Sequence, residues 1–115
     1  MKRHSWKEIE REQLSEKVAR QVIHAERITV ARIYLSKGAV VPRHSHENEQ
    51  VTLLDSGRLR FSFDGGDMLL EAGQAMQIPP NAPHGVEALE DSAAVDLFVP
   101  VRQDWVRGDD SYLRR

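Results

Sequence analysis

Two histidines separated by one residue, His44 and His46, are followed four residues later by an amide, Gln50, in a segment bounded by Gly38 and Gly57. Side chains in an extended segment alternate between two faces, so both histidines point to one face and Gln50 can return to it. Neutral imidazoles are common ligands for zinc, iron, nickel and copper. The spacing therefore predicts part of a metal site that needs a further ligand from another segment.

The sequence offers that ligand as His84, in a second segment between Gly73 and Gly85. A short strand there is followed by Pro-Pro-Asn-Ala-Pro, a pattern typical of a rigid turn, and His84 stands where the next strand should begin. The predicted ligands of a divalent metal are therefore His44, His46, Gln50 and His84. The set does not select the ion, because three nitrogens and one oxygen accept nickel, zinc, manganese, iron or cobalt.

These two segments resemble the paired motifs of the cupin family. The residues that match the first motif are Gly38, His44, His46, Gln50 and Gly57, and those that match the second are Gly73, Pro79 and His84. Two positions depart from the usual pattern: Gln50 replaces a glutamate, and Asn81 replaces a glycine. Asparagine also tolerates a positive φ, so the second departure is mild. The resemblance implies a jelly-roll β-barrel that can hold a small ligand in its mouth.

Composition limits the function classes. The 115 residues are enough for one domain, and 16 basic and 18 acidic residues give a net charge of -2, so no nucleic-acid partner is expected. The absence of cysteine excludes disulfides, thiolate ligands, iron–sulfur clusters and a cysteine nucleophile. The first residues, MKRHSWKEIERE, lack an apolar run. We therefore expect a soluble cytoplasmic protein with no membrane partner.

Most of the chain carries short β-strand patterns. Residues 1–17 are polar and are interpreted as an N-terminal arm, and residues 18–115 as the cupin domain. The expected strands are 18–24, 27–35, 50–54, 58–63, 68–71, 74–78, 85–89 and 93–99. Evenly spaced short strands without a long amphipathic helix indicate an all-β fold. The prediction is a single-domain cupin jelly-roll β-barrel of antiparallel strands.

An acidic residue, Asp96, stands in the middle of an otherwise apolar strand. An ionised carboxylate costs several kcal/mol to bury unpaired, so it needs a partner, a metal or a water-filled cavity. Phe98 shares its face, and Arg102 follows shortly after the strand. One interpretation is a buried ion pair between Asp96 and Arg102 that fixes the C-terminal tail. The other is that the acid, the aromatic ring and the guanidinium line a pocket beside the metal.

The C-terminal pattern and the HSHENEQ segment are similar to the KdgF family, small cupins of pectin and alginate breakdown. The pattern residues are Asp96, Phe98, Pro100, Arg102, Asp104 and Trp105. Members of that family convert 4,5-unsaturated uronates, which lyases release, to linear 5-keto-4-deoxyuronate. The resemblance implies that Asp96, Phe98 and Arg102 are catalytic and that the metal ligands are the three histidines and Gln50.

The chemistry suits these residue types. A neutral glutamine ligand leaves the full charge of the metal in the site, which favours an anionic substrate. We expect Arg102 to bind the substrate carboxylate, Asp96 to transfer a proton as general acid and base, and Phe98 to pack against the sugar. Arg60 is a weaker candidate for substrate binding, because it could also be a solvent-exposed residue on the outside of the barrel.

Three alternatives stay open. A cupin dioxygenase would use the same ligands with iron or nickel and would consume oxygen. A non-catalytic binder of sugars or small anions would bind without turnover. A structural cupin of the seed-storage type would usually lack the metal ligands. The sequence does not separate a pectin-derived from an alginate-derived substrate, and the resemblance implies a homodimer.

Overall fold

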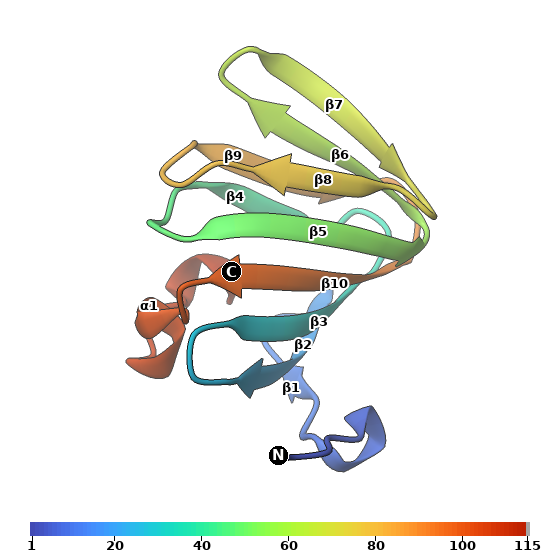
Figure 1. Ribbon diagram of the computed structural model, residues 1–115. Helices are drawn as coiled ribbons and strands as arrows, with labels where there is room; N and C mark the ends of the chain where they lie inside the picture. Colours follow the sequence, from blue (N-terminus) through green and yellow to red (C-terminus); the bar gives the residue numbers. More distant parts are fainter. Residues whose placement is uncertain (115) are drawn as a thin grey trace.

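Two antiparallel sheets that face each other make up the protein (Figure 1). The structure, a computed structural model, describes residues 1–114. The six-stranded sheet has the order β1 (Glu12–Gln13), β2 (Val18–His24), β3 (Thr29–Leu35), β10 (Ser92–Val99), β5 (Glu49–Ser56), β8 (Ala75–Ile78). The four-stranded sheet has the order β4 (Val40–His44), β9 (His84–Ala88), β6 (Arg58–Phe63), β7 (Gly66–Glu71).

The strands follow the alternation of the sequence. In β3 the residues at every second position are buried, from Thr29 to Leu35, and the residues between them are only partly buried. The hairpin between β2 and β3 is confirmed, and so is the hairpin between β6 and β7, which turns at Asp64 and Gly65. The eight expected segments all form strands, with end points that differ by a few residues, whereas β4 (Val40–His44) was not among them.

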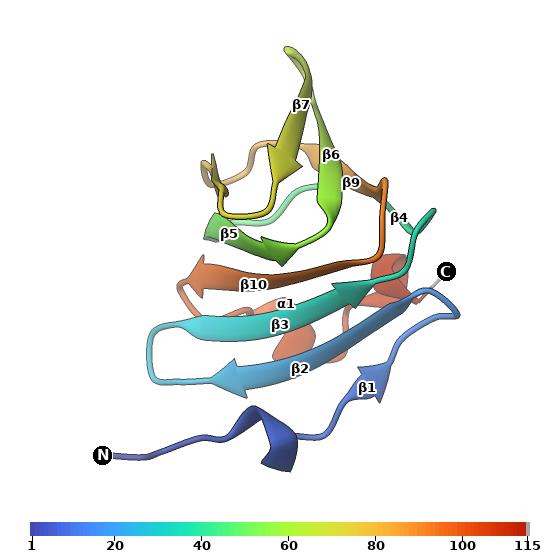
Figure 2. The ribbon, with the colours of Figure 1, turned by 90° about the vertical axis from the view of Figure 1, so that its right-hand side faces the viewer.

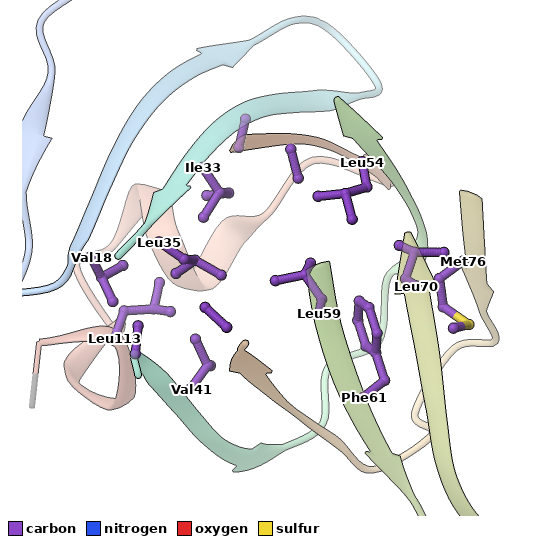
Figure 3. Close-up of a cluster of buried hydrophobic side chains, with 14 of the residues drawn as sticks. Val18, Ile33, Leu35, Val41, Leu54, Leu59, Phe61, Leu70, Met76 and Leu113 are labelled. Atoms are coloured by element: carbon purple, nitrogen blue, oxygen red, sulfur yellow. The ribbon is translucent and has the colours of Figure 1, made fainter. Parts of the chain in front are cut away.

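The hydrophobic core fills the space between the two sheets (Figure 3). Ile33 and Leu35 of β3 face Leu59 and Phe61 of β6 across this space. Burying a large apolar side chain contributes about 1.5–3 kcal/mol, so these rows hold the sheets together. The histidine cluster adjoins this core, because His44 and His84 line one cavity together with core residues such as Val41 and Phe61.

The predicted all-β jelly roll is confirmed, with a difference in detail. Among residues 1–114 the strands form two separately hydrogen-bonded sheets rather than one closed barrel. The connections give the jelly roll its order, because β10 lies between β3 and β5, and β9 lies between β4 and β6 (Figure 2). Hairpin patterns predict pairing only between strands that are consecutive in the sequence, whereas these pairs join strands that are far apart in the sequence.

Both ends of the chain add elements that the strand patterns did not predict. The N-terminal residues form a short 3-10 turn, η1 (Trp6–Glu8), and β1, which pairs with β2. After β10 come a single helical turn, α1 (Gln103–Val106), and a 3-10 turn, η2 (Ser111–Leu113). In the described part of the chain, no helix has the length and apolar character needed to cross a membrane.

Candidate metal centre

Three histidines converge at one end of the interior. His44 ends β4 and His84 begins β9, and the two residues are direct partners in the register of these strands. His46 follows two residues after His44 and reaches the same point. One ring nitrogen from each histidine lies within 4.8 Å of the others, so the cluster could hold a metal ion.

Each imidazole is oriented by a backbone carbonyl. The Nδ1 atoms of His44, His46 and His84 lie 2.8, 3.1 and 2.8 Å from the carbonyl oxygens of Pro42, Asn48 and Ala82. A carbonyl only accepts, so Nδ1 carries the proton in each ring and the Nε2 lone pair is free. The buried Nε2 of His84 has no hydrogen-bond partner. This arrangement is the usual support of histidines that bind a metal.

Burial keeps the three rings neutral. Desolvation lowers the pKa of His44 and of His46 to about 4, and it also lowers the pKa of His84. The positive charge of Arg102 lowers all three values further. Neutral imidazoles with free Nε2 lone pairs are the form that binds a metal at neutral pH.

A chain of hydrogen bonds fixes the orientation of Gln50. The Thr52 hydroxyl donates to Asp96 Oδ1 at 2.5 Å, and the Thr52 hydroxyl oxygen accepts from Gln50 Nε2 at 2.9 Å. A carboxylate can only accept, so the hydroxyl proton points to Asp96 and the amide nitrogen of Gln50 points to Thr52. Gln50 Oε1 is thereby turned to His46 Nε2, at 3.0 Å.

Gln50 Oε1 and His46 Nε2 therefore present two lone pairs to each other with no proton between them. Two acceptors at 3.0 Å repel unless a cation lies beside both. Metal–ligand bonds of about 2.0–2.2 Å place neighbouring ligand atoms at such a separation. The three histidines could therefore hold a divalent metal, with the Nε2 of His84 unpartnered and Gln50 Oε1 beside the Nε2 of His46.

Asp96 lies beside this cluster on β10. It is the direct cross-strand partner of Thr52 on β5, and its carboxyl group faces the interior although the residue as a whole keeps some exposure. Burial raises the pKa of Asp96 to about 6, although the Thr52 hydrogen bond and the charge of Arg102 oppose the rise. The group can therefore hold or release a proton close to neutral pH.

Arg102 is 1% exposed, but its ion-pair partner is not Asp96. Its Nε and Nη2 donate to the two carboxylate oxygens of Asp104, at 2.9 and 2.7 Å, and Nη2 also donates to the Tyr112 hydroxyl at 2.7 Å. These bonds use the Nε–H and both Nη2 hydrogens. The Asp96–Arg102 ion pair considered from the sequence is absent among the described residues, and Nη1 is the amino group of Arg102 left for a ligand.

Aromatic rings surround the guanidinium. Arg102 lies over the rings of Phe98 and Trp105, at 4.6 and 4.4 Å from their centroids, and Arg20 covers Trp105 at 4.6 Å. Phe98 also meets His46 edge to face, with centroids 5.6 Å apart. Phe98 is 2% exposed, so it contributes a buried wall of the site. Stacking on both rings holds the buried cation in place.

Most of these groups line one small cavity of about 60 Å³. The predicted residues that line it are His44, Gln50, His84, Asp96, Phe98 and Arg102. His46 joins them through its contacts with Gln50 and Phe98. Arg60 lies elsewhere: it is exposed on β6 and pairs with Glu87 at 3.1 Å.

Two residues of the site were missed in the sequence. Thr52 shares the face of Gln50 at a spacing of two, which was a usable signal, although threonine is common in strands. Tyr112 lies in a tail without any periodic pattern, yet its ring stacks on His44 with centroids 4.5 Å apart. No local signal in the sequence predicts that contact, because it depends on how the tail docks.

Known proteins resemble this chain in fold and, in part, in sequence. A structure of KdgF from Halomonas sp. has 28% identity and a TM-score of 0.79, and the match covers 86% of this chain and 94% of that one. An RmlC-like cupin from Shewanella frigidimarina has 26% identity and a TM-score of 0.82, over 89% of this chain and 93% of that one.

A predicted oxalate decarboxylase from Thermotoga maritima shares the fold alone, with 19% identity and a TM-score of 0.73 over 84% of this chain and 97% of that one. No curated protein sequence matches the chain significantly. The family model described as the cupin domain matches residues 31–100, which is more than half of the sequence. The chain therefore belongs to the cupin family.

Proposed function

We propose that this protein is a metal-dependent enzyme that ketonises 4,5-unsaturated uronates to linear 5-keto-4-deoxyuronate. The observation that carries the proposal is that Asp96, an acid with a raised pKa, is linked through the Thr52 hydroxyl to the Gln50 amide beside the three histidines and shares a cavity with buried Arg102. The similarity to KdgF from Halomonas sp. supports the same reaction. The proposed ligands of the divalent metal are His44, His46, Gln50 and His84.

The reaction is an isomerisation and needs no oxidant. Opening of the sugar ring breaks the bond between C1 and the ring oxygen, which leaves an aldehyde at C1 and an enol at C5. The enol then loses its hydroxyl proton and C4 gains a proton, so that C4 becomes a methylene and C5 a carbonyl. A bound divalent metal supplies Lewis acidity next to the oxygen that loses its proton.

The residues of the chain supply the rest. Asp96 delivers a proton to C4 and is recharged by the proton that leaves the enol, a task suited to a group with a pKa of about 6. Arg102 binds the substrate carboxylate through the Nη1 group that its internal hydrogen bonds leave free. Phe98 presents an apolar wall, which excludes water and strengthens the charge interactions in the site.

The test follows the ultraviolet absorbance of the 4,5 double bond in unsaturated monomers from pectin and from alginate lyase digests. Metal-loaded protein should speed its loss over the spontaneous rate, and chelated protein should not. Asp96→Asn should lower the rate by about 100-fold or more, because general acid–base catalysis contributes about 10²–10⁴-fold. Asp55→Asn is the matched control, since Asp55 is an exposed carboxylate on β5.

Three results would decide the matter. A metal-loaded protein that only matches the spontaneous rate contradicts the proposal. So does an Asp96→Asn variant that folds, binds metal and retains full activity. Uptake of oxygen with either substrate would instead identify a dioxygenase.

A further inference from the structure

The C-terminal turn η2 closes the cavity that holds the candidate metal centre. In Figure 1 the red C-terminal segment turns back after β10, and η2 packs against β4, the strand that carries His44. Tyr112 stacks on His44. Leu113 enters the hydrophobic core, as Figure 3 shows. Both residues line the same cavity as Asp96 and Arg102.

The cavity is too small for a sugar. Its volume is about 60 Å³. A water needs roughly 10–15 Å³ on this scale, so only a few waters fit, whereas pockets for small molecules measure about 300–1,000 Å³. A monosaccharide therefore requires some part of the wall to move away.

Tyr112 also accepts a hydrogen bond from the Arg102 guanidinium, the group that would bind a substrate carboxylate. Its hydroxyl oxygen accepts from Arg102 Nη2 at 2.7 Å and from Trp105 Nε1 at 3.1 Å. A substrate carboxylate binds an arginine best through two parallel hydrogen bonds. Nη1 is free, but its neighbour Nη2 is shared between Tyr112 and Asp104. If Tyr112 moved away, one Nη2 hydrogen would become free, and Nη1 and Nη2 together could bind a carboxylate through two parallel hydrogen bonds.

The ion pair between Arg20 and Asp110, which we call the latch, holds the turn in place. Asp110, which precedes η2, is 2% exposed and accepts a hydrogen bond from the buried Arg20 of β2 at 2.5 Å. Exposed Arg114 also bonds to Asp110. The turn itself is short, with backbone bonds from Leu113 N to Asp110 O and from Arg114 N to Ser111 O. Opening of this segment breaks these bonds and withdraws Leu113 from the core, so the closed form is the resting one, and each bond that is removed should raise the open fraction.

We propose that residues 110–114 form a lid over the metal centre, in which Tyr112 fills the substrate space when closed and leaves Arg102 when open. The inference rests on the proposed function for the identity of the ligand, but the movement of the lid can be measured without turnover. Closure then competes with ligand binding. The apparent dissociation constant of a ligand is its intrinsic value divided by the open fraction, so a weaker latch gives tighter binding.

The test uses the full chain loaded with zinc and three variants. Asp110→Asn weakens the latch to Arg20, and Tyr112→Phe keeps the ring but removes the hydroxyl that holds Arg102 and Trp105. Asp109→Asn is the matched control, because Asp109 is exposed and pairs only with exposed Arg107 among the described residues. Circular dichroism confirms that each variant folds.

Two readouts are expected to change together. Hydrogen exchange at the Leu113 and Arg114 amides and the rate at which a chelator removes zinc should both rise about fivefold or more in Asp110→Asn and Tyr112→Phe, and stay unchanged in Asp109→Asn. The saturated analogue D-galacturonate should bind these two variants more tightly than the parent protein, by a similar factor. A merely structural role of the tail would instead weaken binding.

The outcomes separate the lid from the proposed function. Unchanged exchange and unchanged zinc removal in both latch variants would overturn the lid. Weaker galacturonate binding in variants whose tail exchanges faster would overturn it as well. Faster exchange and faster zinc removal, without galacturonate binding to any form, would support the lid and count against a uronate substrate.

Discussion

Thr52→Val removes one hydroxyl from the centre of the site and should weaken metal binding. Valine keeps the branched shape, so the change isolates the hydrogen bonds. The Thr52 hydroxyl is the acceptor for the Gln50 amide and the donor to Asp96. Without it, the amide nitrogen of Gln50 loses the hydroxyl oxygen that accepts its hydrogen bond. The ligand oxygen is then no longer held toward His46.

The structure sets the size of both expected effects. Loss of a group that orients a metal ligand usually costs about 10–100-fold in metal affinity, which is about 1.4–2.7 kcal/mol. The change also leaves the Gln50 amide and an Asp96 oxygen without partners at a site that is 2% exposed at Thr52. An unpartnered buried group costs about 1–3 kcal/mol, so we expect a loss of about 2–3 kcal/mol in the free energy of unfolding. For a domain of this size that lowers Tm by roughly 10–20 °C.

Competition with a chromophoric chelator measures the metal affinity, and thermal unfolding of the metal-free protein measures stability. Thr52→Ser is the matched control, because it keeps the hydroxyl and should retain most of the affinity. The reasoning is refuted if Thr52→Val binds zinc as tightly as the parent protein. It is also refuted if the serine variant loses as much affinity as the valine variant.

Two further predictions concern stability. Hydrogen bonds from Arg114 and Arg20 hold the pKa of Asp110 below its usual range, so this carboxylate stabilises the fold fully above the unfolded pKa of about 4 and loses that effect as the pH falls through the lower folded value. Below pH of about 4, the free energy of unfolding should therefore fall less steeply with pH in Asp110→Asn than in the parent protein. An equally steep fall in the variant would contradict this prediction. Gly57→Ala should lower the free energy of unfolding by about 2 kcal/mol or more, because Gly57 has φ +91° and an added Cβ would collide with Ser92. Denaturant unfolding measures this loss. An alanine variant as stable as the parent protein would show that the turn can move.

Much of the metal centre was predictable because its signals are local. The two-residue spacing of His44 and His46 and the proline-rich turn before His84 mark strand ends, and these are the ends that meet. The fold class followed from the even spacing of the strands. Alternation could not reveal that β10 pairs with both β3 and β5, since this pairing joins segments far apart in the sequence.

The part of the site that holds Asp96 and Arg102 was less predictable because tertiary contacts determine the partners of these two residues. The sequence suggested Asp96 as a partner for Arg102, but in the structure Asp96 is hydrogen-bonded to Thr52 and Arg102 to Asp104. Both pairings satisfy the same rule that a buried charge needs a partner. Only the register of β5 against β10 decides which partner is within reach.

The central place of β10 also sets the order in which the protein can assemble. This strand is the last in the sequence, yet it lies between β3 and β5 in the six-stranded sheet. Until β10 has left the ribosome, the facing edges of β3 and β5 have no hydrogen-bond partners, and exposed edges can pair with other chains. The nascent chain therefore cannot complete its large sheet one hairpin at a time, because that sheet needs β10 before β3 and β5 can be joined.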